Sequence, residues 1–255
     1  ALSSAASDVY KRQLMTLTRL PLWRVITLDK KYFCDTLLYW PLVGFITGGT
    51  TAGVFWAASY FMPGLPACIL AIIARLLLTG AMHEDGLADF FDGFGGGSTK
   101  EKILAIMKDS HIGSYGTIGL IVYFLLYASF LYNIDRTTLL PLIFLADVSS
   151  KLCSSILINS LPYARKEEES KTKLVYRKNH FFKILTISII ALVPFLHITE
   201  IIYILAIIPA ILTAILLRYY LKKKIGGYTG DCCGACVLII EQVIYCGYCI
   251  IYFLP

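Results

Sequence analysis

The stretch LPACILAIIARLLLTGAMHEDGLADFFDG (residues 65–93) joins an apolar run to a dense cluster of acids. Its first part, residues 65–82, is nearly as long as a helix that crosses a bilayer, which needs about 20 residues. Its second part places four carboxylates within nine positions, at Glu84, Asp85, Asp89 and Asp92. Acids beside lipid are costly unless a partner compensates them, and several carboxylates together suit a hard divalent cation. We therefore expect the chemistry of the protein at this boundary.

The composition indicates a membrane protein. Hydrophobic residues make up 57% of the 255-residue chain and charged residues 16%, and the mean hydropathy is +0.70. These values lie outside the usual range of a soluble domain. The net charge of +6 does not indicate nucleic-acid binding, because the basic residues fall between the apolar runs rather than along one stripe. They are better interpreted as signals of membrane topology.

We expect an all-α fold, a polytopic integral membrane helix bundle with about seven transmembrane helices and active-site loops on the cytoplasmic side. The predicted spans cover residues 37–62, 65–82, 117–133, 138–161, 182–197, 200–218 and 235–254. Residues 1–13 are polar and begin without Met, so we expect an unstructured or non-native segment there. Residues 14–255 then form a single transmembrane domain.

The distribution of Lys and Arg predicts the orientation. Six lie before the first span, three in residues 83–116, seven in residues 162–183 and four in residues 218–231, whereas the opposite side carries Arg136 alone. The positive-inside rule places the amino terminus, the acidic run and both long basic loops in the cytoplasm, with the carboxyl terminus outside.

The acidic run has the spacing of a helix face. If residues 85–92 are helical, Asp85, Asp89 and Asp92 lie on one face at i, i+4 and i+7. That face would bind Mg²⁺ and leave positions for water and substrate phosphates. His83 and His111 suggest zinc, but carboxylates outnumber imidazoles and favour Mg²⁺. The alternative is a solvated helix end, where acids contribute roughly 1 kcal/mol or less.

Further polar segments lie at the same predicted boundary. Asp109 could complete the cation site, and the Gly- and Ser-rich loop around it could bind phosphate or merely cap a helix. Three lysines, Lys222 to Lys224, would steer an anionic substrate or contact lipid headgroups. The candidates for substrate binding are Lys108, Ser110, Arg165, Gly227, Thr229 and Asp231.

Four charges fall inside predicted spans. Asp147 and Lys151 are four residues apart and are expected to pair, while Arg75 and Glu241 are expected to face the bundle interior. A structural ion pair and a substrate role both remain open. The two CxxC motifs that begin at Cys233 and Cys246 are separated by an apolar segment, which favours helix packing over zinc binding.

Several motifs together resemble the cobalamin synthase family, whose members are adenosylcobinamide-GDP ribazoletransferases. They are Thr18–Pro21, Trp40–Gly44, His83–Gly93, Met107–Ser110 with Gly113 and Gly116, Pro162–Arg165 and Gly226–Asp231. They occur in the family's order over nearly the whole chain beyond residue 13. The sequence departs from the family pattern at Glu84, where an apolar residue is common, and at Lys151, where an arginine is expected.

The resemblance implies the last assembly step of cobalamin. A ribose hydroxyl of α-ribazole, or of its 5′-phosphate, would attack adenosylcobinamide-GDP in a Mg²⁺-dependent reaction that releases GMP. Asp85, Asp89 and Asp92 are then the primary catalytic and metal candidates, with Asp109, Glu84 and Asp231 ranked below them. The implied partners are the two substrates and the lipid bilayer, and the sequence leaves a homo-oligomer open. Two alternatives are a CDP-alcohol phosphatidyltransferase-like phospholipid synthase and a cation transporter.

Overall fold

The structure of the chain, a computed structural model, describes residues 17–20, 24, 39–165, 181–192, 195 and 201–253. The predicted unstructured segment, residues 1–13, lies outside the described residues. The described residues form helices joined by turns, with one isolated bridge between Tyr163 and Tyr228. The helices are α2 (Trp40–Ala58), α3 (Gly64–Thr79), α4 (Met82–Gly96), α5 (Lys100–Ile106), α6 (Ser114–Asn133), α7 (Arg136–Asn159), α8 (Phe181–Leu192), α9 (Ile201–Ile225) and α10 (Gly230–Phe253). The all-α prediction is confirmed.

Each of the seven predicted apolar segments contains a helix. Four helices, α6, α7, α9 and α10, are long and apolar enough to cross a membrane by themselves. Helices α3 and α4 meet at a bend of 91° and together add a fifth candidate, either a broken span or a re-entrant segment. Helix α8 is a shorter apolar helix of 12 residues, and most of the predicted span after it lies outside the described residues. The protein is thus a polytopic helical membrane protein with four or five candidate spans in its described part.

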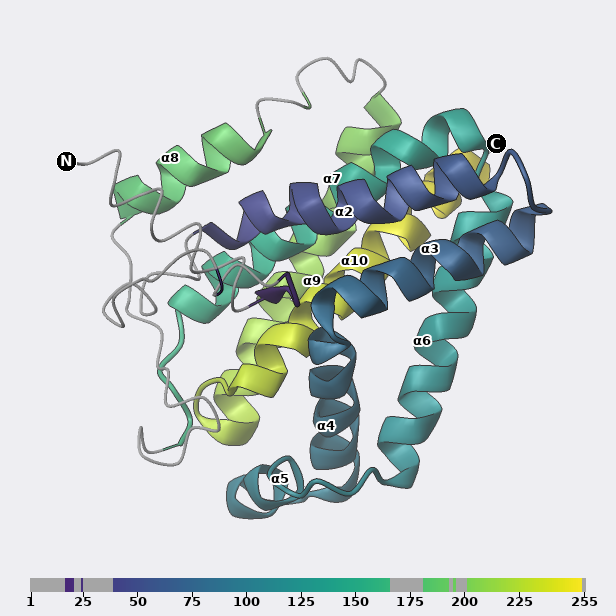
Figure 1. The fold of residues 1–255 in the computed structure, drawn as a ribbon. Helices are drawn as coiled ribbons and strands as arrows, with labels where there is room; N and C mark the ends of the chain where they lie inside the picture. The colour runs from purple at the N-terminus through teal and green to yellow at the C-terminus, as the bar shows by residue number, and fades with distance from the viewer. Residues whose placement is uncertain are drawn as a thin grey trace.

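The bend between α3 and α4 comes from two consecutive left-handed residues. Gly80 has φ of 68° and Ala81 has φ of 58°, and the Ala81 N–H closes the end of α3 on the Leu76 carbonyl at 3.1 Å. A glycine in this conformation is a common way to end a helix. The acidic run consequently forms its own helix, α4, which leaves the direction of α3 (Figure 1).

Two boundaries differ from the prediction. Helix α9 continues through Lys222–Lys224 to Ile225, and α10 begins at Gly230 rather than at residue 235. Lysine is a good helix former, so the basic segment extends α9 rather than ending it. Asp231 therefore lies in the first turn of α10 and not in a loop.

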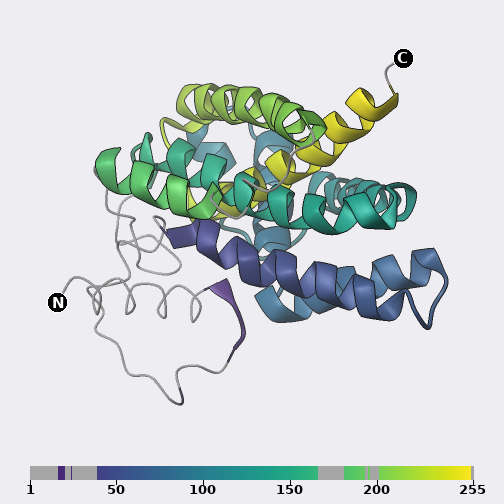
Figure 2. The same ribbon diagram turned by 90° about the horizontal axis from the view of Figure 1, so that it is seen from above.

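Helix α7 forms the centre of the bundle. It packs between α2 and α9 (Figure 2), and its buried residues run from Leu139 to Ile158. Helices α6 and α9 instead expose large apolar side chains, such as Leu125 and Leu216, each 67% exposed. In a membrane protein these surfaces face lipid.

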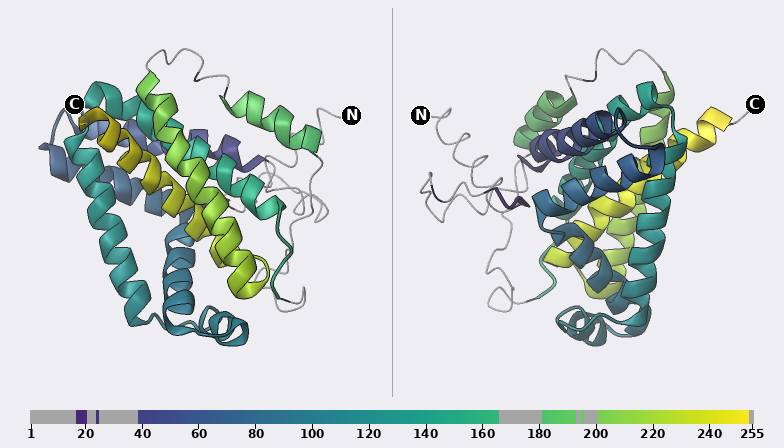
Figure 3. Two further views of the ribbon diagram at one scale, coloured as in Figure 1. Left: turned by 180° about the vertical axis from the view of Figure 1, so that it is seen from behind. Right: turned by 45° about the vertical axis from the view of Figure 1, so that its right-hand side comes forward.

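The molecule has two different ends. The α2–α3 turn, the α6–α7 turn and the C-terminal end of α10 lie together at one end (Figures 1 and 3). Helices α4 and α5 and the α9–α10 turn lie toward the other (Figure 3). All the segments predicted to carry chemistry are at this second end, which we call the acidic end.

Candidate active site

Helix α4 distributes its four acids over different surroundings. Asp85 is exposed and Asp89 is half-buried, whereas Asp92 and Glu84 are buried. Glu84 points into the bundle, where the charges of Arg75, Glu241 and Lys151 act on it and its Oε2 has no hydrogen-bond partner among the described residues. The predicted helix is confirmed, and Asp85 and Asp89 are the acids that it leaves accessible.

The first turns of α10 pack directly onto α4. A Cβ atom at Gly86 would lie 2.8 Å from the carbonyl oxygen of Asp231, and one at Gly234 would lie 3.0 Å from the Cα atom of His83. Gly86 therefore needs to be glycine so that the two backbones can approach, and a side chain at Gly234 would fit only tightly. Residue 231 is brought beside the acidic run although 139 residues separate it from Asp92 along the chain.

The turn before α10 is held by the segment after α7. The Tyr228 N–H donates to the Pro162 carbonyl at 3.0 Å, and the Ala164 N–H donates to the Tyr228 carbonyl at 2.9 Å. A Cβ atom at Gly227 would lie 2.1 Å from the Pro162 carbonyl oxygen, so only glycine fits there. The glycine-rich turn before α10 and the Pro162–Arg165 segment, far apart in sequence, thus form one structural unit.

Arg165 and Thr229 fix this unit to the helices around it. Arg165 Nη2 donates to the Leu104 carbonyl at 3.1 Å, which ties the unit to the C-terminal part of α5. The buried Thr229 hydroxyl accepts the Cys232 N–H at 3.3 Å and therefore caps the start of α10. The same hydroxyl lies 3.4 Å from Asp231 Oδ2. The hydrogen bonds of Thr229 indicate a positioning role for it.

Asp92 is engaged by the start of α6. Its Oδ2 accepts the Gly113 N–H at 2.7 Å, and its Oδ1 accepts the Gly116 N–H at 2.8 Å. Amides at a helix N-terminus have no partner inside the helix, and a carboxylate there is further favoured by the helix dipole. A Cβ atom would lie 2.5 Å from an Asp92 carboxylate oxygen at Gly113 and 2.4 Å from one at Gly116. Asp92 thus joins α4 to α6.

The Lys108–Ser110 segment lies in an exposed connection between α5 and α6. Asp109 Oδ1 is 2.7 Å from His111 Nδ1, and the Asp109 side chain is 58% exposed. The hydrogen bond from the His111 side chain lowers the pKa of Asp109. The structure thus pairs Asp109 with its own loop, and the placement of Lys108 and Ser110 leaves both side chains in contact with solvent.

Two basic residues near the acidic helix were not among the predicted site residues. Arg19 lies at the α3–α4 bend. Its backbone N–H donates to the Leu78 carbonyl at 2.7 Å, and its guanidinium covers Gly80. Lys100 Nζ lies 3.5 Å from the position of a Cβ at Gly226. The Thr18–Pro21 motif was the available signal for Arg19; nothing in the sequence distinguishes Lys100 from other surface lysines.

The buried charges form a separate network in the bundle core. Arg75 donates to both oxygens of Glu241, at 2.6 and 2.7 Å, and to the Tyr127 hydroxyl at 3.1 Å. Asp147 pairs with Lys151 and accepts from the Thr47 hydroxyl at 2.9 Å. The predicted Asp147–Lys151 pair and the inward orientation of Arg75 and Glu241 are confirmed. The four charges bind one another, as a structural network does.

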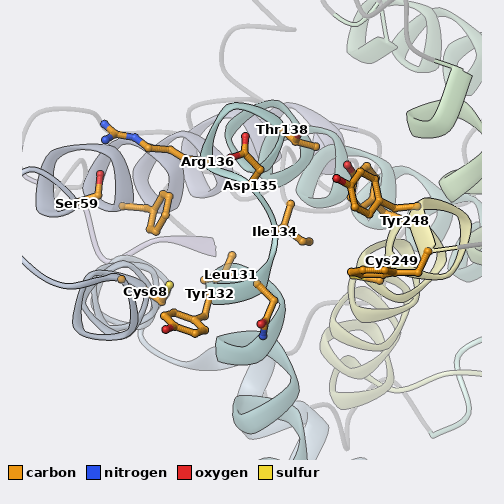
Figure 4. A pocket seen from close by; sticks show the side chains of 15 residues that line it. Ser59, Cys68, Leu131, Tyr132, Ile134, Asp135, Arg136, Thr138, Tyr248 and Cys249 are labelled. Carbon is orange, nitrogen blue, oxygen red and sulfur yellow. The ribbon is translucent and has the colours of Figure 1, made fainter.

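A cavity of about 540 Å³ lies at the end opposite the acidic run (Figure 4). Its polar lining includes Asp135, which caps α7 by accepting the Thr137 N–H at 3.0 Å. It also includes Arg136, which donates to the Trp56 carbonyl at 3.2 Å and covers the Tyr60 ring. Because Asp135 and Arg136 bind the ends of neighbouring helices, this cavity does not offer the charged groups expected of the predicted active site.

The arrangement at the acidic end defines a class of protein. Long apolar helices carry a carboxylate-bearing helix against a glycine-rich turn at one end, as in an integral membrane protein whose polar groups gather at one membrane boundary. The family model described as cobalamin-5-phosphate synthase matches residues 10–249. The chain belongs to this family and is a transferase of cobalamin biosynthesis.

Three similar proteins share the name "Adenosylcobinamide-GDP ribazoletransferase". A protein of Shewanella baltica is 35% identical over 245 residues, covering 93% of this chain and 92% of its own length. One of Shewanella amazonensis is 37% identical over 211 residues and 81% of each chain. One of Shewanella oneidensis is 34% identical over 244 residues, again 93% and 92% of the two chains. No solved structure matches the chain.

Proposed function

We propose that this transferase joins α-ribazole, or its 5′-phosphate, to adenosylcobinamide-GDP and releases GMP, forming adenosylcobalamin or its 5′-phosphate. The observation that carries the proposal is the packing of the first turn of α10 against the acidic helix α4 at Gly86. This packing brings the glycine-rich turn, the Pro162–Arg165 segment and the accessible aspartates to one end of the bundle. The name shared by the relatives supports the same substrates.

The donor set suits Mg²⁺. Among the described residues no three His, Cys, Asp or Glu side chains are close enough to hold a metal ion by themselves. Mg²⁺ commonly takes one or two carboxylates and completes its octahedron with water and substrate phosphates, so two accessible aspartates suffice. Asp85 and Asp89 would hold the ion, with Asp231 beside them, while Asp92, Asp109 and Glu84 remain predicted ligands. When bound, Mg²⁺ would neutralise the diphosphate and the charge on the departing GMP.

The residues of the chain would bind and orient the two substrates. Arg19, Lys100 and Arg165 supply positive charge around the acidic end, and such groups bind phosphate oxygens through charge-assisted hydrogen bonds. Together with the backbone of the Gly226–Thr229 turn, they would hold the diphosphate in line with the ribose hydroxyl. One aspartate of α4 would orient that hydroxyl and accept its proton as the oxygen attacks the cobinamide-side phosphorus.

We further propose that the acidic end faces the cytoplasm from the bacterial inner membrane. The basic residues of α5, of the α9 end and of residues 162–165 all lie toward this end, as the positive-inside rule requires of the cytoplasmic side. Substrates would then reach the site from the compartment in which nucleotides are made.

The test is a product assay on membranes that contain the full chain. Adenosylcobinamide-GDP and α-ribazole are supplied with Mg²⁺, and a parallel reaction receives CDP-diacylglycerol and an alcohol acceptor. We expect GMP and a corrinoid carrying the nucleotide loop in the first reaction, and no GMP when α-ribazole is omitted. Release of CMP with a lipid product, and no GMP, would contradict the proposal.

A further inference from the structure

An apolar groove runs along the lipid-facing side of α9. It has a volume of about 450 Å³ and lies between α7, α8 and α9. Its walls are mostly aliphatic and include Ile156, Leu192, Ile207, Ile211 and Ile215. The volume is typical of ligand pockets, which measure about 300–1,000 Å³.

The groove ends at a positive charge. Ile211, Ile215, Arg218 and Lys222 follow spacings of 4, 3 and 4 residues and therefore form one stripe on α9. Ile211 is 48% exposed and Ile215 58% exposed, whereas Arg218 lines the end of the groove nearer the α9–α10 turn. The stripe passes from apolar to basic in the direction of the acidic end.

The guanidinium of Arg218 is held at this position. Its Nε donates to the Ser160 hydroxyl at 2.8 Å, which fixes the side chain against the end of α7. Among the described residues no carboxylate forms an ion pair with it. A guanidinium that keeps its terminal nitrogens for another partner is well suited to the oxygens of a phosphate.

The side chains of Lys223 and Lys224 lie on other faces of α9 than that of Lys222. Lys223 lies over the Tyr219 ring at 5.9 Å, and Lys224 lies over the Tyr220 ring at 6.0 Å. Lys222 is four residues after Arg218 and shares its face instead. The end of α9 thus carries two pairs of positive charges. Arg218 and Lys222 lie on the same face as the groove, and Lys223 and Lys224 do not.

We propose that this groove binds one anionic phospholipid. An acyl chain occupies the aliphatic groove along α7, α8 and α9, and the headgroup phosphate binds Arg218 and Lys222. Charge complementarity selects this occupant, because the groove is apolar along its length and basic at the end that the membrane surface reaches. The site is separate from the accessible aspartates of α4, so it does not depend on the proposed reaction.

Lipid retention by the purified protein tests the proposal. The full chain is reconstituted with equal amounts of phosphatidylglycerol and phosphatidylcholine, re-extracted in mild detergent, and the retained lipids are counted by native mass spectrometry. The variant Arg218→Gln/Lys222→Gln is compared with Lys223→Gln/Lys224→Gln, which loses the same two charges from the other faces. The single variant Lys222→Gln serves if the first fails to insert.

We expect the wild type and the Lys223/Lys224 variant to retain phosphatidylglycerol over phosphatidylcholine. Retention should fall about fivefold for each charge removed at Arg218 and Lys222. Ala214→Trp, which fills the groove without changing charge, should also lower retention. Equal loss in both double variants, equal retention of the two lipids by the wild type, or displacement of the lipid by millimolar inorganic phosphate would overturn the proposal.

Discussion

The acids in the bundle core and the acids on α4 are neutralised in different ways. Asp147 and Glu241 are almost completely buried, and each contacts a cation of the same chain. Asp85 on α4 is exposed, and no basic side chain among the described residues forms an ion pair with it. A buried charge without a partner is costly, so the core acids had to be paired within the fold. The α4 acids at the boundary can instead serve an external cation and its phosphate ligands.

Asp92 is an intermediate case on the same helix. It is buried like the core acids, but its partners are two backbone N–H groups at the start of α6 rather than a side-chain cation. The comparison therefore separates three uses of a carboxylate within one chain: a structural ion pair, a helix-joining contact and an accessible ligand.

The largest effect should come from the core network. Glu241→Gln removes the carboxylate that binds both terminal nitrogens of Arg75 and leaves the more distant Asp147, at 3.9 Å, as a charged neighbour. Breaking a buried pair in this way costs about 3–5 kcal/mol. Unfolding of the detergent-solubilised protein by titrated denaturant measures the loss. Glu101→Gln, at an exposed acid of α5, should change the free energy of unfolding by less than about 0.5 kcal/mol. A Glu241 variant as stable as this control would show that the core acids do not have to be paired within the fold.

Next in size is the loss of activity at the accessible acids. Asp85→Asn and Asp89→Asn should each lower kcat for GMP release about 10²–10³-fold, the usual size for losing one group that stabilises developing charge. The free energy of unfolding of the Asp85 variant should stay near that of the wild type, because this side chain is exposed. Full activity in both variants would remove the metal site from α4.

Asp92→Asn should lower stability by about 1–3 kcal/mol, since the amide group of Asn cannot accept a second backbone N–H and leaves it unsatisfied. Hydrogen exchange should rise at whichever of the Gly113 and Gly116 amides faces the Asn nitrogen, because that amide loses its acceptor. The Mg²⁺ concentration for half-maximal activity should remain near the wild-type value. A tenfold increase in that concentration would show that Asp92 also binds the ion.

The smallest effect should come from a helix cap near the site. Thr99 accepts the Lys102 N–H at 3.3 Å and caps α5, so Thr99→Ala should cost about 1 kcal/mol, felt within that helix. Activity should remain within about twofold of the wild type if the α4 acids act through charge rather than through general rigidity. A loss as large as that of the Asp85 variant would show that the position of α5 controls the reaction.

The sequence predicted the apolar helices, the helical acidic run and the pairing of Asp147 with Lys151, because each depends on local spacing. It did not predict the 91° bend, which results from the left-handed Gly80 and Ala81. It also grouped Asp92 with Asp85 and Asp89 on one face. The helical α4 keeps that spacing, but the two amides at the start of α6 that donate to Asp92 were not predicted, because contacts between helices cannot be obtained from the periodicity of one of them.

The other contacts that could not be predicted from the sequence also join residues far apart in the chain. Asp147 and Thr47 are 100 residues apart, and Arg75 and Glu241 are 166 apart. Arg75 on α3 and Glu241 on α10 belong to different helices, and only the tertiary arrangement of the bundle brings their side chains together. The resemblance over whole motifs, in contrast, was enough to indicate the family.

Whether Asp85 and Asp89 hold a cation on the substrate diphosphate can be measured with Mn²⁺ in place of Mg²⁺. Electron paramagnetic resonance is recorded on the purified protein with adenosylcobinamide-GDP, and ³¹P hyperfine coupling reports phosphate oxygens bound to the ion. We expect a ³¹P-coupled, protein-bound Mn²⁺ signal in the wild type and its loss in Asp85→Asn/Asp89→Asn. The same coupled signal in the double variant, with unchanged affinity, would contradict this expectation.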